Sequence, residues 1–364
     1  MKAGIVGLPN VGKSTLFNCL SNAKAQSANF PFCTIEPNIG VVNVPDSRVA
    51  KLEELVKPER VQMATVDIVD IAGLVRGASK GEGLGNQFLA NIRETDAIIH
   101  VIRCFDNDNI IHVDTTIDPI RDKETIDFEL QLKDLETLDK KLEKVKKTAR
   151  TGNKEAQKEL EVLVRAKEGL EAAISVRAIN FTAKEREEYI APLQLITDKP
   201  VLYVCNVDEG SAVQGNDYVK ALKEAVKNEN AEVIILAVAT EADITELETF
   251  EERQLFLEDL GLEEPGASVL IRAAYKLLKQ QTYFTAGVKE VRAWTINIGD
   301  SAPQAAGVIH TDFEKGFIRA EVIAYDDFVS YGSEAKVKEA GKMRVEGKEY
   351  IVKDGDVMHF RFNV

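Results

Sequence analysis

The residues best suited to phosphate chemistry lie within the first fifteen positions. The stretch G-L-P-N-V-G-K-S-T begins at Gly7 and has the G-x-x-x-x-G-K-S/T spacing of a phosphate-binding loop. Gly7 and Gly12 allow the backbone to approach phosphate oxygens, and the N–H groups of such a loop point at the anion. Lys13 places a positive charge on the terminal phosphates, and the Ser14 hydroxyl can bind Mg²⁺. These residues predict nucleotide binding.

Two later segments carry further candidates, in the order found in switch-type nucleotide hydrolases. Thr34 lies between the first expected helix and the second expected strand, where a threonine completes the Mg²⁺ shell when a γ-phosphate is present. Asp70 ends the third strand and can hold Mg²⁺ through water, while the Gly73 N–H can sense the γ-phosphate. The alternatives are an ordinary loop threonine and a strand-end turn. The order of Thr34, Asp70 and Gly73 after the phosphate loop favours the functional interpretation.

The group that would orient the attacking water is missing from its usual place. Leu74 stands where many GTPases have a glutamine, so we expect slow hydrolysis or help from a partner, a monovalent cation or another residue. His112, after the fourth strand, is a candidate; the alternative is a surface histidine. His100 lies inside an apolar strand and is expected in the core. Asn10 can ligate K⁺ beside the phosphates, or can simply serve a turn.

The purine-reading segment departs from the guanine pattern. Guanine-specific proteins carry N-K-x-D at the end of the fifth strand, and its carboxylate accepts hydrogen bonds from guanine. Here the tetrad is Asn206-Val207-Asp208-Glu209. Asn206 can still address a purine, but Val207 replaces the lysine and the longer Glu209 replaces the aspartate. Adenine lacks the donors that such a carboxylate requires, so the displaced carboxylate favours ATP over GTP.

Six apolar runs are expected to form the sheet that positions these residues. They are residues 2–7, 39–44, 65–70, 97–104, 201–206 and 232–238. Several are apolar throughout, which is typical of a parallel sheet covered by helices on both faces. The sequence therefore predicts a doubly wound α/β domain with its ligand site at the carboxyl ends of the strands.

A long insertion separates the fourth and fifth strands. Apolar residues recur at steps of three and four along two arms, which are joined by the turn Thr151-Gly152-Asn153. The stripes comprise Phe128, Leu132, Leu135, Leu138, Leu142, Val145 and Ala149, then Ala156, Leu160, Leu163, Leu170 and Ile174, with Lys167 interrupting the second. This pattern predicts an antiparallel helical hairpin. Residues 140–158 contain eight basic and two acidic residues, so the tip can contact nucleic acid or be merely a solvated face.

The pattern changes again near Tyr283. Residues 246–281 are expected to be mostly helical. Beyond them, short strands are predicted at residues 291–296, 318–323, 350–352 and 357–362, with a helix near residues 303–309. This is a separate α+β domain of about eighty residues, which we interpret as a docking module.

Composition limits the remaining function classes. The chain has 364 residues, 45% of them hydrophobic and 29% charged, with a net charge of −14. This balance is ordinary for a soluble protein and argues against a surface that binds nucleic acid throughout. The N-terminus leads directly into the first strand, no apolar run can span a bilayer, and the four cysteines are scattered. We therefore expect a cytoplasmic protein with reduced thiols.

Together these motifs resemble the YchF family of Obg-like ATPases over nearly the whole chain. The resemblance is carried by residues 7–15, 29–38, 70–86 and 91–97, by the N-x-x-E tetrad, and by residues 281–287 and 310–364. It implies a Ras-like P-loop domain over residues 1–280, with a coiled-coil insertion at about 122–195. It also implies a TGS domain of β-grasp fold over residues 281–364.

The resemblance also implies an activity and its residues. It implies slow Mg²⁺-dependent ATP hydrolysis and association with the 70S ribosome and its 50S subunit, by a monomer that does not bind membranes. ATP contacts would fall on Asn10, Val11, Gly12, Lys13, Ser14 and Thr15, with Asn206 and Val207 near the base. Mg²⁺ would be held by Ser14 and Thr34, His112 would aid catalysis, and K⁺ would activate. The rival interpretations are a GTPase of the same fold, a ribosome- or RNA-binding scaffold with incidental hydrolysis, and, less favoured, a metabolic phosphotransferase.

Overall fold

The computed structural model describes residues 1–22, 39–71, 84–110, 112–113, 116–229 and 231–363. The chain divides into two compact units. The first, the N-terminal unit, comprises Met1–Gly40 and Asp67–Leu270; the second, the C-terminal unit, comprises Val41–Val66 and Ile271–Val364. The sequence placed one boundary between residues 280 and 281 and assigned residues 41–66 to the first domain. The two compact units begin and end at other residues, and the predicted domain bounds stay a prediction.

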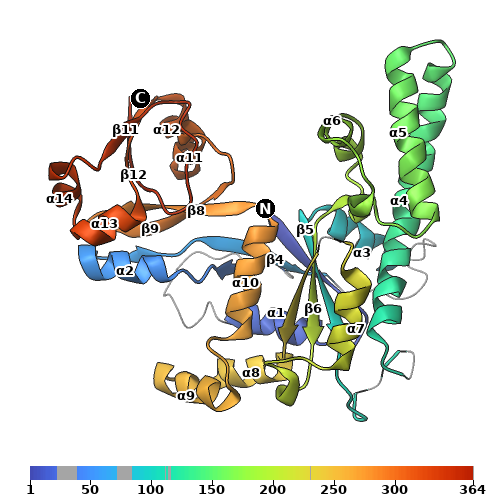
Figure 1. Cartoon of the computed structure of the whole chain (residues 1–364), viewed down its shortest axis with the longest axis horizontal. Helices are drawn as coiled ribbons and strands as arrows, with labels where there is room; N and C mark the ends of the chain where they lie inside the picture. The colour runs from blue at the N-terminus through green and yellow to red at the C-terminus, as the bar shows by residue number, and fades with distance from the viewer. Residues whose placement is uncertain (23–38, 72–83, 111, 114–115, 230, 364) are drawn as a thin grey trace. The chain divides into compact units, whose positions relative to one another are not determined.

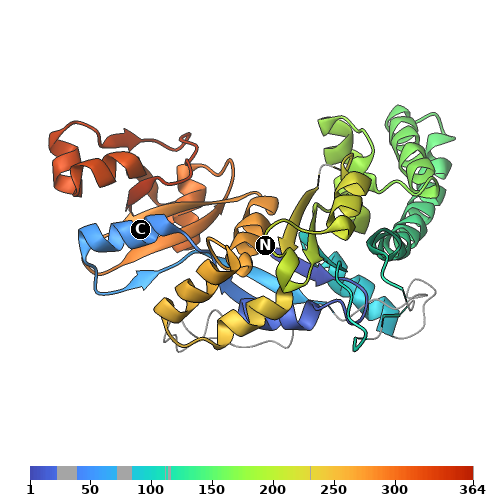
Figure 2. The same ribbon diagram turned by 60° about the horizontal axis from the view of Figure 1, so that its bottom comes forward.

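The N-terminal unit is built on a six-stranded sheet with the order β2-β4-β1-β5-β6-β7. Its strands are β1 (Lys2–Val6), β2 (Ile39–Asn43), β4 (Thr65–Asp70), β5 (Ala97–Arg103), β6 (Val201–Asn206) and β7 (Glu232–Leu236). The pairs from β4 to β7 are parallel. All residues of β5 and β6 are buried, because these runs are apolar and helices cover both faces of the sheet (Figures 1 and 2). The six expected strands and the α/β class are confirmed.

Helices connect these strands and continue beyond them. They are α1 (Lys13–Asn22), α3 (Leu84–Arg93), α7 (Asp217–Val226), α8 (Val238–Glu246), α9 (Phe250–Leu260) and α10 (Gly266–Leu277). α1 packs on α8, whereas α7 packs on α4, the first arm of the insertion. Glu241 of α8 accepts hydrogen bonds from the N–H groups of Gly266 and Ala267, which fixes the first turn of α10. No helix within the described ranges combines the length and apolarity needed to cross a bilayer.

The insertion forms the predicted hairpin of α4 (Pro119–Ala149) and α5 (Lys154–Glu171), which lie side by side in Figures 1 and 2. Gly152 has φ 84°, and the Asn153 side chain accepts from the Ala156 N–H to begin α5. Two predicted core positions are wrong. Phe128 is 57% exposed because α4 extends beyond the reach of the shorter α5, and Ile174 is 45% exposed because it follows the end of α5.

Short helical turns return the chain from the hairpin to β6. They are η2 (Val176–Ala178), α6 (Ala183–Glu185), η3 (Arg186–Ile190), η4 (Ala191–Leu193) and η5 (Ile196–Asp198). The buried carboxylate of Asp134, on α4, accepts from the N–H groups of Ile196 and Thr197 and from the Thr197 hydroxyl. These bonds satisfy buried donors and hold the return segment against the base of the hairpin.

The C-terminal unit has a second sheet, with the order β11-β10-β12-β8-β9-β3. Its strands are β3 (Val61–Gln62), β8 (Gln280–Ala286), β9 (Val291–Asn297), β10 (Phe317–Ile323), β11 (Arg344–Glu346) and β12 (Val357–Phe362). The antiparallel pair β8–β9 is followed by a helix, and β12 returns parallel to β8 in the middle of the sheet. This is the expected β-grasp arrangement; its assignment as a TGS domain stays a prediction. β11 was not predicted, and residues 350–352 form only a single bridge, between Ile351 and Ser301.

Five helices accompany this second sheet. They are α2 (Ser47–Val56), α11 (Ala302–Ile309), α12 (Thr311–Lys315), α13 (Tyr325–Tyr331) and α14 (Glu334–Glu339). α11 covers a core that contains Tyr283 and Phe360, and the Tyr283 hydroxyl donates to the Ala305 carbonyl. α2 packs on β9 and α13, so the segment between β2 and β4 is part of this unit. The local sequence pattern of residues 41–66 does not predict that arrangement.

Candidate nucleotide-binding site

The loop between β1 and α1 has a conformation that requires glycine at two positions. Gly7 has φ 155° and Gly12 has φ 99°, which side chains disfavour. A Cβ atom at Gly7 would lie 2.4 Å from the Val101 carbonyl oxygen, and one at Gly12 would lie 2.5 Å from Asn206 Nδ2. The two glycines are therefore fixed by backbone angle and by close approach together, as expected for a loop that wraps around phosphates.

The residues after the loop form the first turn of α1. The Leu16 N–H donates to the Gly12 carbonyl at 2.9 Å, and the side chains of Ser14 and Thr15 are exposed. The N–H groups of a first helical turn lack intrahelical partners and can donate to an anion. Val11 is buried and contributes packing beneath the loop. The exposed Asn10 has φ 62°, so its backbone serves the turn.

Lys13 is held across the phosphate-binding loop. Its Nζ donates to the Leu8 carbonyl at 2.7 Å, and the residue is 7% exposed. Burial lowers the pKa of Lys13 from 10.5 to about 8, although the negative charge of Asp70 partly opposes that shift. An ammonium group has three N–H donors, so two remain for phosphate oxygens. A bound polyphosphate would restore the charged form by supplying the missing negative charge.

Asp70, at the end of β4, provides the structural test for a metal ion. Burial raises its pKa and the charge of Lys13 opposes the rise. Its Oδ1 is buried, and among the described residues no group donates a hydrogen bond to it. An unpartnered carboxylate oxygen and the exposed Ser14 hydroxyl are hard oxygen donors of the kind that Mg²⁺ prefers. The described residues contain no cluster of three or more histidine, cysteine or carboxylate ligands.

Asn206, at the end of β6, ties two parts of the site together. Its Nδ2 donates to the Val11 carbonyl at 2.9 Å, and its Oδ1 accepts from the Val238 N–H at 3.1 Å. The side chain thereby joins the phosphate-binding loop to the start of α8. Because an amide nitrogen has two hydrogens and an amide oxygen two lone pairs, half of its capacity remains. Asn206 is thus a positioning residue in this structure, and its predicted contact with the purine stays a prediction.

The last position of the tetrad, where guanine-specific proteins have an aspartate, carries Glu209. Val207 is buried, and its N–H donates to the Leu236 carbonyl. The Asp208 carboxylate caps a short turn, η6 (Glu209–Ser211), by accepting from the N–H and the hydroxyl of Ser211, each at 3.1 Å. Glu209 is exposed. Asp208 is therefore committed to the local turn.

The two histidines singled out in the sequence are both buried. His100 lies in β5, its ring centroid is 5.6 Å from that of Tyr203, and burial lowers its pKa to about 3, so it is a neutral core residue as expected. His112 is not the surface histidine offered as the alternative. Its side chain is 3% exposed, and its Nε2 lies 2.7 Å from Oδ2 of Asp122, at the start of α4. Its expected role in catalysis stays a prediction.

Three predicted residues cannot be placed. Thr34, Gly73 and Leu74 lie outside the described residues, so their roles also stay predictions. Sequence reasoning missed Val101, Val238 and Asp122. Val101 and Val238 act through their backbones, which leaves no signal in the side-chain pattern. Asp122 is one of several acidic residues near the start of a long helix, and only the fold shows which of them meets His112.

Two family models match the chain. One, described as "50S ribosome-binding GTPase", matches residues 2–149. The other represents the C-terminal region of YchF GTPases, is described as a protein of unknown function, and matches residues 280–363. Both matches agree with the fold, because the first spans the phosphate-binding loop and the second spans β8 to β12.

Full-length relatives extend the match. The chain is 58% identical over 363 residues to the "Ribosome-binding ATPase YchF" of Escherichia coli O157:H7, covering 100% of this chain and 99% of the relative. It is 54% identical over 366 residues to the protein of that name from Bacillus subtilis (strain 168), covering all of both chains. The solved "YchF GTPase" of Schizosaccharomyces pombe superposes with a TM-score of 0.90 at 40% identity, covering 99% of this chain and 97% of that one. These full-length matches agree with the glycine-constrained loop, the buried lysine and the N-x-x-E tetrad. They show that the chain belongs to the YchF family.

Proposed function

We propose that this protein is a Mg²⁺-dependent ATPase that associates with the ribosome and acts as a nucleotide-dependent switch. The observation that carries the choice of ATP is the tetrad at the end of β6. Asp208 is committed to Ser211, and the only carboxylate at the guanine-reading position belongs to the longer, exposed Glu209. A site without a fixed carboxylate has no device to reject adenine. The bacterial relatives named as ribosome-binding ATPases support the same choice.

The residues of the loop would bind the triphosphate. Lys13 donates its two remaining N–H bonds to phosphate oxygens, and the N–H groups at the start of α1 donate to the same anion. Bound Mg²⁺ would neutralise charge between the phosphates, held by Ser14, Thr34 and Asp70. Asn10 would hold a K⁺ ion beside them.

Hydrolysis by the isolated protein should be slow. Leu74 cannot orient water, and His112 is engaged with Asp122 in a buried pair. For His112 to orient the attacking water, the nitrogen used would have to be Nδ1, because Nε2 is held by Asp122. Gly73 would sense the γ-phosphate through its N–H, so the presence of ATP is reported to the segment that follows β4.

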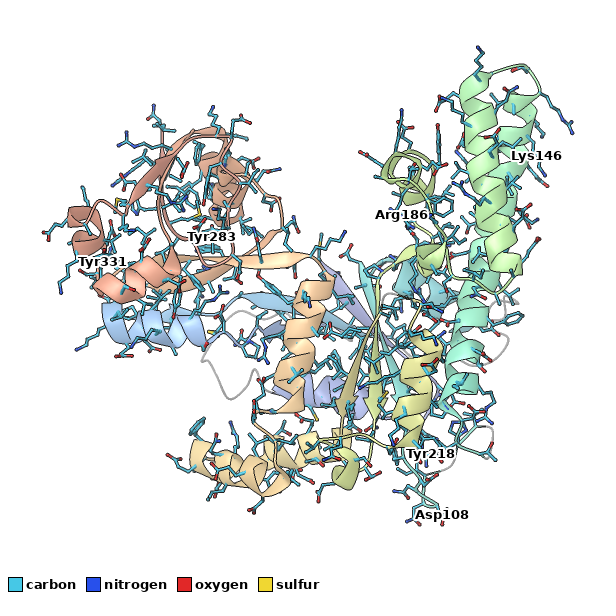
Figure 3. The ribbon with its side chains drawn as sticks, viewed as in Figure 1. Asp108, Lys146, Arg186, Tyr218, Tyr283 and Tyr331 are labelled. Atoms are coloured by element: carbon cyan, nitrogen blue, oxygen red, sulfur yellow. The ribbon has the colours of Figure 1, made fainter. Side chains whose placement is uncertain are left out.

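The hairpin tip would contact the ribosome, through ribosomal RNA of the 50S subunit. Exposed basic side chains surround the turn at Gly152, including Lys146 (Figure 3) and Arg150. Lys141 is committed to Glu159 at 2.7 Å and is not part of this contact. A cytoplasmic monomer fits this assignment.

Competition calorimetry tests the choice of nucleotide. The purified protein is titrated with ATP and with GTP in Mg²⁺, and we expect the stronger binding for ATP. A large preference for GTP would contradict the argument from Asp208 and favour the GTPase alternative.

Ribosome co-sedimentation tests the rest of the proposal. Binding should depend on the nucleotide and should weaken when exposed tip residues such as Lys146 and Lys147 are neutralised, with a shallower salt dependence. Lys184→Gln is the matched control, because Lys184 is an exposed lysine of α6 that lies away from the tip turn. Binding that ignores the nucleotide and survives Lys13→Ala would favour a scaffold with incidental hydrolysis.

A further inference from the structure

Residues 41–66, called here the connector, join two strands of the nucleotide-binding sheet but fold with the C-terminal unit. The connector leaves the first sheet through β2 and returns to it through β4. β4 ends at Asp70, a half-buried residue whose carboxylate interacts electrostatically with Lys13. A displacement of β4 at Asp70 would act on the connector through the continuous chain.

Backbone hydrogen bonds incorporate the connector into the second sheet. β3 pairs with β9, with Val61 opposite Val291. The Glu59 N–H donates to the Val288 carbonyl at 2.9 Å, and the Val291 N–H donates to the Arg60 carbonyl at 3.1 Å. These bonds make the connector an edge of the β-grasp sheet, so it is not a free loop.

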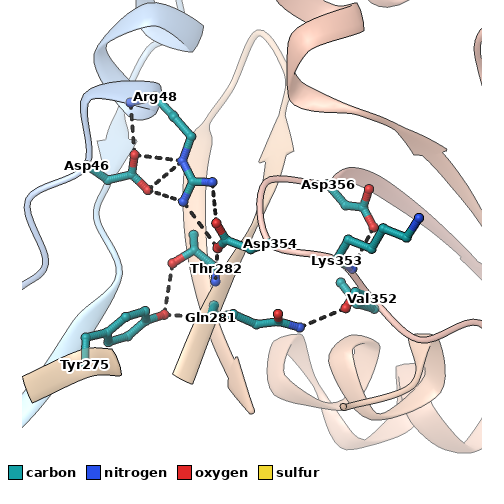
Figure 4. Close-up of polar contacts among 9 residues, drawn as sticks. All are labelled: Asp46, Arg48, Tyr275, Gln281, Thr282, Val352, Lys353, Asp354 and Asp356. Atoms are coloured by element: carbon teal, nitrogen blue, oxygen red, sulfur yellow. Dashed lines mark hydrogen bonds and ion pairs between the residues drawn. The ribbon is translucent and has the colours of Figure 1, made fainter. Parts of the chain in front are cut away.

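Arg48, at the start of α2, attaches the connector through its side chain to the loop before β12 (Figure 4). Its Nη1 donates to Asp354 Oδ2 at 2.7 Å, and its Nη2 donates to Asp354 Oδ1 at 3.3 Å. Its Nε and Nη2 also donate to Asp46, which caps α2. The guanidinium lies 5.1 Å from the ring centroid of Phe284, on β8. One planar cation therefore bridges both carboxylates and contacts β8, a geometry that a lysine could not reproduce.

The residues that receive this attachment are themselves fixed to β8. Asp354 Oδ1 accepts from the Thr282 N–H at 2.9 Å, and the Gln281 side chain donates to the Val352 carbonyl at 2.8 Å (Figure 4). Gly355 has φ 87°, and a Cβ atom there would lie 3.0 Å from Arg48 Nη1. The loop before β12 is thus shaped to fit the guanidinium and is bonded to the first strand of the β-grasp sheet.

We propose that Arg48 couples the nucleotide site to the C-terminal unit, by fastening the connector to the Asp354 loop and to β8. This inference rests on the proposed function, because the signal is the nucleotide bound near Asp70. Nucleotide exchange changes the ligands of that carboxylate, β4 carries the change into the connector, and Arg48 delivers it to β8 and β9. The C-terminal unit is then an output of the switch.

Hydrogen exchange on the full chain tests the coupling. Amides of β8 and β9 are compared between Mg²⁺–ADP and Mg²⁺ with a non-hydrolysable ATP analogue. In the wild type we expect protection to differ by about tenfold between the two states, within the usual range of allosteric coupling. In Arg48→Met, which keeps the aliphatic length but removes the guanidinium, the difference should fall below about twofold, while the affinity for the analogue stays unchanged. Asp354→Asn keeps an acceptor for the Thr282 N–H and should give the same loss.

Arg361→Met is the matched control. Arg361 joins β12 to β10 through Glu321, at 3.1 Å, in the same unit but away from the connector. This variant should keep the wild-type difference. A tenfold difference that persists in both Arg48→Met and Asp354→Asn, or wild-type strands that do not respond although the analogue binds, would overturn the coupling. Failure of the wild type to bind the analogue at all would overturn the proposed function itself.

Discussion

Replacing Asn206 by alanine should weaken ATP binding without removing any predicted phosphate ligand. The substitution deletes the amide that accepts from the Val238 N–H and donates to the Val11 carbonyl. Both backbone groups then lose their partner in a buried place. The phosphate-binding loop is no longer attached to the start of α8, although Lys13 and Ser14 are intact.

The size of the effect follows from the two groups left unpaired. Each costs about 1–3 kcal/mol if water cannot reach it. The loop lies next to the nucleotide site, where water can enter, so the lower end applies and the sum is about 2 kcal/mol. That free energy lowers the population of the binding-competent loop about 30-fold, and the apparent affinity falls by the same factor.

Titration calorimetry with ATP, ADP and GTP on the wild type and on Asn206→Ala measures this loss. Because the two hydrogen bonds of Asn206 position the loop and do not involve the base, we expect the three affinities to fall by a similar factor. Asn153→Ala is the control, since it removes a helix cap at the hairpin turn, costs about 1 kcal/mol of stability, and should leave ATP affinity unchanged. An Asn206→Ala variant that binds ATP within twofold of the wild type would refute the reasoning. Loss of ATP and ADP affinity alone, with GTP affinity kept, would show that the residue acts as a base contact.

Three further substitutions test the site and the fold. Gly12→Ala should abolish ATP binding, because φ 99° is unfavourable for alanine and its Cβ would lie 2.5 Å from Asn206 Nδ2; calorimetry checks this. Lys13→Met should be more stable than the wild type below pH 8. Between pH 8 and 10.5 the unfolded wild type binds more protons than the folded form, so the unfolding free energy of the wild type rises with pH. The difference in unfolding free energy between Lys13→Met and the wild type should therefore shrink by about 3 kcal/mol, which urea unfolding would measure. Asp134→Ala leaves three buried donors unpaired, two of them on Thr197, and should cost about 3 kcal/mol or more of unfolding free energy with unchanged ATP affinity.

Local patterns predicted the elements whose environment is uniform along the chain. The strands of the first sheet are buried on both faces, so continuous apolar runs such as residues 97–103 identified them. The hairpin turn was equally clear, because Gly152 and Asn153 have defined roles at the ends of helices. The phosphate-binding loop was predicted because its chemistry fixes residue types at fixed spacing.

The remaining features depend on contacts between residues far apart in the sequence. Phe128 fits the hairpin stripe, but whether it is covered depends on where α5 ends, which a single helical pattern does not contain. The connector contains a helix and a two-residue strand, and its contacts with β9, α13 and Asp354, all distant in sequence, assign it to the C-terminal unit. The environment of His112 follows from the packing of α4 against the sheet, so its burial was not predictable from its neighbours in sequence.

The order in which the C-terminal unit is assembled has a consequence for the protein's own synthesis. Arg48 and Asp354 are separated by 306 positions, so the connector emerges long before the strands that receive it. At about 5–20 residues per second, that interval lasts roughly 15–60 s. Until β9 has emerged, the edge of the connector that pairs with it is exposed to other chains and to chaperones. Premature termination before β9 would leave that edge without its partner strand, and termination between β9 and Asp354 would leave Arg48 without its carboxylate partner across the unit.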